Sequence, residues 1–151
     1  MGADRSYVDS NRRELERLKA LVDRASDEDL ARPMDAGWTV AGVLGHMAFW
    51  DLRIVTALER WRPDGTGPFP SYHEDAVDWI NDAAKPIISA LEPRAAARVA
   101  VEAAEAADRG VAEMSDALLA KNLAAGLYIN TDRADHRGEH LDEIERVLPP
   151  D

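Results

Sequence analysis

The sequence predicts an all-α protein, a helical bundle that forms one domain over residues 1–151. Apolar residues recur at three- and four-residue intervals in two long stretches, 7–25 and 40–61, as they do on one face of an amphipathic helix. No stretch alternates apolar and polar residues in the way a half-buried strand does. With 151 residues, 46% of them hydrophobic, the chain is long enough to bury a core of its own.

The first half of the chain is expected to hold two of the helices. Helix 7–25 is followed by a connection, 26–38, which contains a proline and a glycine and has room for one short turn after Ser26. Helix 40–61 is the clearest core helix, and Thr39 is placed to cap its start. It ends before a loop, 62–70, that holds three prolines and two glycines.

The second half is expected to hold three more helices. Ser71-Tyr72-His73-Glu74 has the form of a capping box and predicts a helix that runs to Leu91, with Pro86 kinking or dividing it. Pro93 suits the first position of the next helix, which reaches at least Met114 and at most Asn122. The last helix is predicted over residues 127–148.

Composition narrows the function classes. The net charge of -11 disfavours binding to phosphate backbones and to anionic membranes, so neither nucleic acid nor membrane is an expected partner. No apolar run approaches the ~20 residues of a membrane-spanning helix, and the cytoplasm is the expected location. There is no cysteine, so any sulfur chemistry requires a small thiol from outside the chain.

The four histidines carry most of the functional information. His136 and His140 are four residues apart on the last predicted helix, so their side chains lie one turn apart on one face. That face also holds Ile144, which points the pair toward the core. His46 lies near the edge of the core stripe of helix 40–61. Histidines on facing helices can meet inside a bundle and build a metal site there.

Each histidine also has an ordinary reading as a satisfied core residue. Two adjacent buried imidazoles without a compensating charge are costly, however, and the three together favour a bound metal. Three imidazoles without cysteine suit a divalent transition metal such as Zn, Ni or Fe, and they leave one position open for water or substrate. His73 falls inside the capping box, so we expect it to be exposed.

The residues around these histidines resemble a known superfamily. Gly37-Trp38-Thr39-Val40, Val43-Leu44-Gly45-His46 and Trp50-Asp51 are similar to the second helix of the DinB-like superfamily. Asn130-Thr131 and Asp135-His136-Arg137-Gly138-Glu139-His140-Leu141 resemble its later histidine-bearing helix, in a form similar to the mycothiol-dependent maleylpyruvate isomerase branch.

This resemblance implies a four-helix bundle of up-down-down-up topology with short extra helical segments, often assembled as a homodimer. It implies one divalent metal held by His46, His136 and His140. Characterised members include transferases and isomerases that use low-molecular-weight thiols, which makes mycothiol the expected thiol cosubstrate beside a small-molecule substrate.

Candidate substrate contacts lie close to His46. Met47 and Trp50 are read first as core residues and second as the apolar wall of a pocket beside the metal. Arg53 is close in angle to His46 and is placed either to receive an anionic substrate or to form an ordinary ion pair. Asp135 and Glu139 are candidates for orienting the imidazoles or for simple surface solvation.

The sequence therefore predicts a metal-dependent transferase or isomerase in which a metal-activated thiol or water is the nucleophile. Two alternatives stay open. One is a helical bundle that binds metal without catalysis, as a stress or interaction protein. The other is a metal-dependent hydrolase that uses the same three histidines with a carboxylate base.

Overall fold

The computed structural model describes residues 2–61 and 75–151, and these residues are helical without a strand, which confirms the all-α prediction. The capping box at residues 71–74, with His73, lies outside the described residues. None of the described helices is long and apolar enough to cross a membrane. The described elements are α1 Tyr7–Arg24, α2 Asp27–Leu30, the 3-10 turn η1 Asp35–Gly37, α3 Val40–Arg60, α4 Asp75–Ser89, α5 Pro93–Ala112, α6 Asp116–Ala124 and α7 Ala134–Val147.

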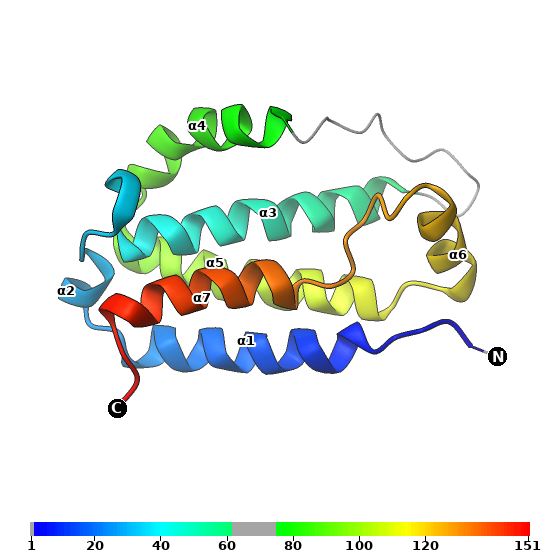
Figure 1. Ribbon diagram of the computed structural model, residues 1–151, viewed down its shortest axis with the longest axis horizontal. Coiled ribbons are helices and arrows are strands. Elements are labelled where there is room, and N and C mark those ends of the chain that lie inside the picture. Colours follow the sequence, from blue (N-terminus) through cyan, green and yellow to red (C-terminus); the bar gives the residue numbers. More distant parts are fainter. Residues whose placement is uncertain (1, 62–74) are drawn as a thin grey trace.

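Helices α1, α3, α5 and α7 lie side by side along the length of the molecule (Figure 1). Helices α1 and α7 run in one direction, and α3 and α5 run in the other. The largest contact joins α3 to α5, while α1 packs against both α5 and α7. Helix α4 lies on the outer side of α3 and packs against it.

The core lies between these four helices. Leucines of α1, aliphatic residues of α3 and the last turns of α7 meet the alanine-rich face of α5. Small side chains let α5 approach α3 closely, since six alanines of α5 are almost fully buried. These are Ala96, Ala97, Ala100, Ala103, Ala104 and Ala107. A second cluster, around Ile54, Val111 and Ile129, closes the other end of the bundle.

Local signals in the sequence explain several helix ends. The Thr39 hydroxyl accepts a hydrogen bond from the Gly42 amide at 3.0 Å, as a cap of α3 does. Ser26 and Asp29 form a capping box that starts the short helix α2. Pro93 is the first residue of α5. Pro86 lies inside α4, which continues to Ser89.

The end of the chain differs from the prediction in two places. The prediction of one helix from Pro93 to at least Met114 and at most Asn122 is wrong, because α5 ends at Ala112 and the Ser115 hydroxyl caps a separate helix, α6. A helix from Leu127 is also wrong, because α7 begins only at Ala134. Residues 125–133 form a non-helical connection in which Gly126 and Leu127 have positive φ angles, 78° and 58°. The Asn122 side chain holds this connection by bonding both the amide and the carbonyl of Ile129.

Candidate metal centre

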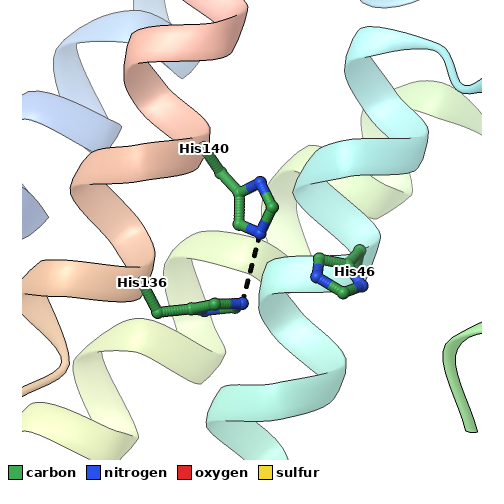
Figure 2. Close-up of side chains that lie close together, drawn as sticks. All are labelled: His46, His136 and His140. Atoms are coloured by element: carbon green, nitrogen blue, oxygen red, sulfur yellow. Dashed lines mark hydrogen bonds between the residues drawn. The ribbon is translucent and has the colours of Figure 1, made fainter. Parts of the chain in front are cut away.

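Three histidines from two helices converge in the structure. His46 comes from α3. His136 and His140 lie one turn apart on α7, and their side chains point toward His46 (Figure 2). The Nε2 atoms of His136 and His140 are 3.2 Å apart, and the His46 ring centre lies 4.8 Å from that of His140 and 5.4 Å from that of His136. One nitrogen from each ring falls within 4.8 Å of the other two. The three residues that the sequence brings forward as ligands therefore form one cluster.

Burial lowers the pKa of two of these rings, His46 and His136. Burial, reinforced by the nearby His140, lowers the pKa of His46 from 6.5 to about 4. Burial, followed by electrostatic interaction with the nearby His140 and Arg133, lowers the pKa of His136 to about 3. Both rings are then uncharged at neutral pH, and a neutral imidazole nitrogen is the form that binds a metal.

Glu143 orients the third ring. Its Oε2 lies 3.2 Å from Nδ1 of His140, one turn further along α7. When Nδ1–H donates to this carboxylate, Nε2 of His140 carries its lone pair toward Nε2 of His136 (Figure 2). The sequence offered Asp135 and Glu139 for this task, but both are exposed, and no hydrogen bond joins either to a histidine in the described part of the chain.

The donor set and its spacing fit a divalent transition metal. Ligand bonds of about 2.0–2.1 Å in tetrahedral geometry separate two nitrogens by about 3.4 Å, close to the spacing of His136 and His140. A ring nitrogen of His46 lies within 4.8 Å of both. Two lone pairs that face each other at this distance would repel, and either a metal ion or the N–H of one ring between the two nitrogens removes this repulsion.

A side chain from α1 sets where the histidine-bearing helix begins. The Asn11 Oδ1 accepts hydrogen bonds from the amides of Arg133 and Ala134, at 2.8 and 3.0 Å. Its Nδ2 donates to the Thr131 carbonyl at 2.9 Å. Asn11 is almost fully buried and supplies a cap for α7 from a distant helix, while Asp132 Oδ1 accepts a further hydrogen bond from the Ala134 amide at 3.0 Å. As a result, His136 lies in the first turn of α7.

A buried ionic network fixes the orientation of α7. Arg137 is only 1% exposed and donates two hydrogen bonds to Asp108 of α5, at 2.8 and 3.0 Å. Asp51 of α3 accepts a hydrogen bond from Nε of Arg133 at 2.9 Å and lies 3.5 Å from Arg137. Two arginines and two aspartates balance in charge, as burial requires. The network ties α7 to both α3 and α5.

The histidine cluster opens into a cavity of about 490 Å³. Trp50 and Arg53 of α3 line it, together with Tyr128 from the connection before α7. The Arg53 guanidinium lies 5.9 Å from the ring centre of Trp50 and 5.8 Å from that of Tyr128. Trp50 donates its indole N–H to Asn81 of α4 at 2.9 Å, which places α4 over the cavity.

Met47 lies elsewhere. Its side chain is 1% exposed and belongs to the hydrophobic core, and it is not among the described residues that line the cavity. A second cavity, of about 460 Å³, also reaches His46 and His140. Trp38 and Lys85 line it together with three acidic residues, Asp78, Asp82 and Glu143. The histidine cluster is therefore reached by two cavities.

The helical fold and this cluster define a class: all-helical proteins with a candidate three-histidine metal centre that opens into a cavity. The family follows from a comparison of the chain with family descriptions. Residues 11–138 match the mycothiol maleylpyruvate isomerase N-terminal domain, and the chain belongs to this family, which is part of the DinB-like superfamily. The match confirms the resemblance drawn from the sequence. No curated protein and no solved structure matches the chain.

Proposed function

We propose that the protein is a metal-dependent transferase or isomerase that uses a low-molecular-weight thiol, with mycothiol as the candidate. One observation carries the proposal: three imidazoles with nitrogens within 4.8 Å of one another border a cavity large enough for a small substrate. Membership of a family named for a mycothiol-dependent isomerase supports the thiol.

Four residues of the chain are proposed to build the metal centre. His46, His136 and His140 would hold a divalent ion such as Zn, Ni or Fe, with Glu143 fixing the ring of His140. The ion, when bound, lowers the pKa of a thiol or water beside it and so supplies a nucleophile. The chain has no cysteine, so the thiol must come from a small molecule.

We assign the substrate contacts from the cavity wall. Trp50 and Arg53 remain proposed contacts because both line the cavity. We propose no substrate contact for Met47, because its side chain is buried in the core.

Hydrolysis is the second candidate. Glu139 lines the same cavity as the three histidines and is an exposed carboxylate on α7. A carboxylate in this place can accept a proton from a water molecule that attacks a bound substrate.

We also propose that the domain has the up-down-down-up topology of DinB-like four-helix bundles and acts as a cytoplasmic homodimer. The directions of α1, α3, α5 and α7 in Figure 1 support the topology. The dimer rests on the family resemblance alone, and the location is the expectation drawn from the sequence.

Cobalt-substituted protein tests the thiol reaction directly. Titration with mycothiol should produce intense sulfur-to-metal charge-transfer absorption, whereas an S-methylated derivative of the same thiol should not. Should several small thiols leave the spectrum unchanged while cobalt stays bound, the thiol proposal fails, and hydrolysis or metal binding without catalysis takes its place.

A further inference from the structure

We propose that Arg133 is the anion-binding residue of the 490 Å³ cavity and that the substrate it receives carries a carboxylate. The inference rests on the proposed function only in placing the substrate in this cavity. The sequence pointed to Arg53 for this role.

Arg133 combines deep burial with unused hydrogen-bond donors. It is 5% exposed and lines the cavity beside His136. Its Nε donates to Asp51 at 2.9 Å, but in residues 2–61 and 75–151 no acceptor meets its two Nη atoms. In these ranges, the fully buried side-chain nitrogens that lack a hydrogen-bond partner are Trp61 Nε1 and Arg137 Nε. The Nη atoms of Arg133 also lack a partner there but are not fully buried, so they are accessible. The cavity is the surface that they can reach.

The neighbouring arginine shows what a purely structural role looks like. Both Nη atoms of Arg137 are bonded, to Asp108 and to the backbone carbonyl of Asn11. Asp51 interacts with both Arg133 and Arg137. The two Nη groups of Arg133 are left to bind another partner. A guanidinium fork matches the two oxygens of a carboxylate, and such charge-assisted pairs are strong where water is scarce.

The charge of the cavity wall favours a single negative charge on the ligand. Among its described lining residues, Arg53 and Arg133 are cationic and Glu139 is anionic. Apolar and aromatic side chains form much of the remaining wall, namely Trp50, Ile54, Val77, Leu127 and Tyr128, and Asn81 and Asn130 also line it. A carboxylate attached to an apolar or aromatic body suits this combination better than a phosphate does. Arg133 lies three residues before His136, so the carboxylate would lie next to the histidine cluster.

Binding of benzoate and of benzamide by metal-free protein at pH 8 tests the assignment, because the two probes differ in charge and hardly in shape. Calorimetry should show that benzoate binds at least about tenfold more tightly than benzamide. The Asp51→Asn variant keeps Arg133 and should keep this preference. The Asp51→Asn/Arg133→Gln variant removes the buried pair as one neutral unit, which avoids an unpaired buried carboxylate, and should bind both probes within about threefold of each other.

Three results would overturn the proposal. The wild-type protein could show no preference for benzoate, the double variant could keep the full preference, or Arg53→Gln alone could abolish it. Folding of each variant is checked by circular dichroism, and the single and double variants share the same substitution at Asp51. Since the assay contains no metal and no thiol, its result is independent of the cobalt titration that tests the proposed reaction.

Discussion

At the scale of single residues, the candidate centre depends on the carboxylate that orients His140. Glu143→Gln removes the charge that holds Nδ1–H, so we expect metal affinity to fall by about tenfold or more while the fold is retained. Competition with a chromophoric chelator measures the affinity. Asp135→Asn is the matched control, because it replaces an exposed carboxylate on the same helix by its amide, and it should leave the metal affinity unchanged. Equal losses in both variants would show that general charge, rather than orientation, is responsible.

The lowered histidine pKa values give the metal-free protein a distinctive pH dependence. In the unfolded chain His46 and His136 titrate near pH 6.5, whereas in the fold their pKa values are about 4 and 3. As the pH falls below 6.5, the unfolded chain binds protons that the fold does not, so the free energy of unfolding decreases. The slope is at most about 1.4 kcal/mol per pH unit for each histidine.

Urea unfolding of chelator-treated protein between pH 7.5 and about 5 measures this slope above the range where most carboxylates titrate. The His46→Gln/His136→Gln variant should lose most of the slope. An unchanged slope in that variant would assign the pH dependence to other groups.

The sequence predicted the ligands but not the residues that support them. His136 and His140 were identifiable because a four-residue spacing places both on one helix face. Arg137 and Asp51 lie on the buried stripes of their helices, beside Leu141 and Ile54, so two opposite charges at core positions were a signal of the ionic network. Glu143 and Arg133 could not be assigned in this way, because their roles depend on rotamers and on the start of α7.

At the scale of helices, the start of α7 depends on Asn11. Asn11→Ala removes the acceptor of the Arg133 amide and one of the two acceptors of the Ala134 amide, the other being Asp132 Oδ1, so we expect the free energy of unfolding to fall by about 1–2 kcal/mol. Ser10→Ala, at the neighbouring position of α1, should change it far less. Urea denaturation of both variants measures the difference. A loss in Ser10→Ala as large as that in Asn11→Ala would mean that α1 itself, and not the cap, is weakened.

Helices with strong local signals were predicted well. The apolar spacing of α1 and α3, the Thr39 cap and Pro93 fixed most of their bounds within a few residues. The connection 125–133 was missed because its apolar residues fit a helical period. Its shape comes from the hydrogen bonds between Asn122 and Ile129 and from Asn11, a residue of α1 that caps the start of α7. Both are tertiary contacts.

At the scale of the whole molecule, the candidate centre joins helices α3 and α7, which lie far apart in the sequence. A metal bound at this junction should stabilise the whole fold. At ~100 times its dissociation constant the gain is about 2.7 kcal/mol, provided that the unfolded chain binds none. We expect a chelator to lower the melting temperature of zinc-loaded protein and leave that of the His136→Ala variant unaffected. If the chelator changes the melting temperature of neither the zinc-loaded protein nor the variant, metal binding does not stabilise the fold.

Metal content per chain is the measurement that tests the central claim most directly. Protein purified without a histidine tag and reconstituted with Zn, Ni or Fe should hold about one ion per chain by elemental analysis, because one cluster of three imidazoles is present. His46→Ala, His136→Ala and His140→Ala should each reduce this to near zero, whereas His73→Ala should retain the ion. Wild-type protein that binds none of the three metals, or an equal loss in all four variants, would contradict a metal centre built by His46, His136 and His140.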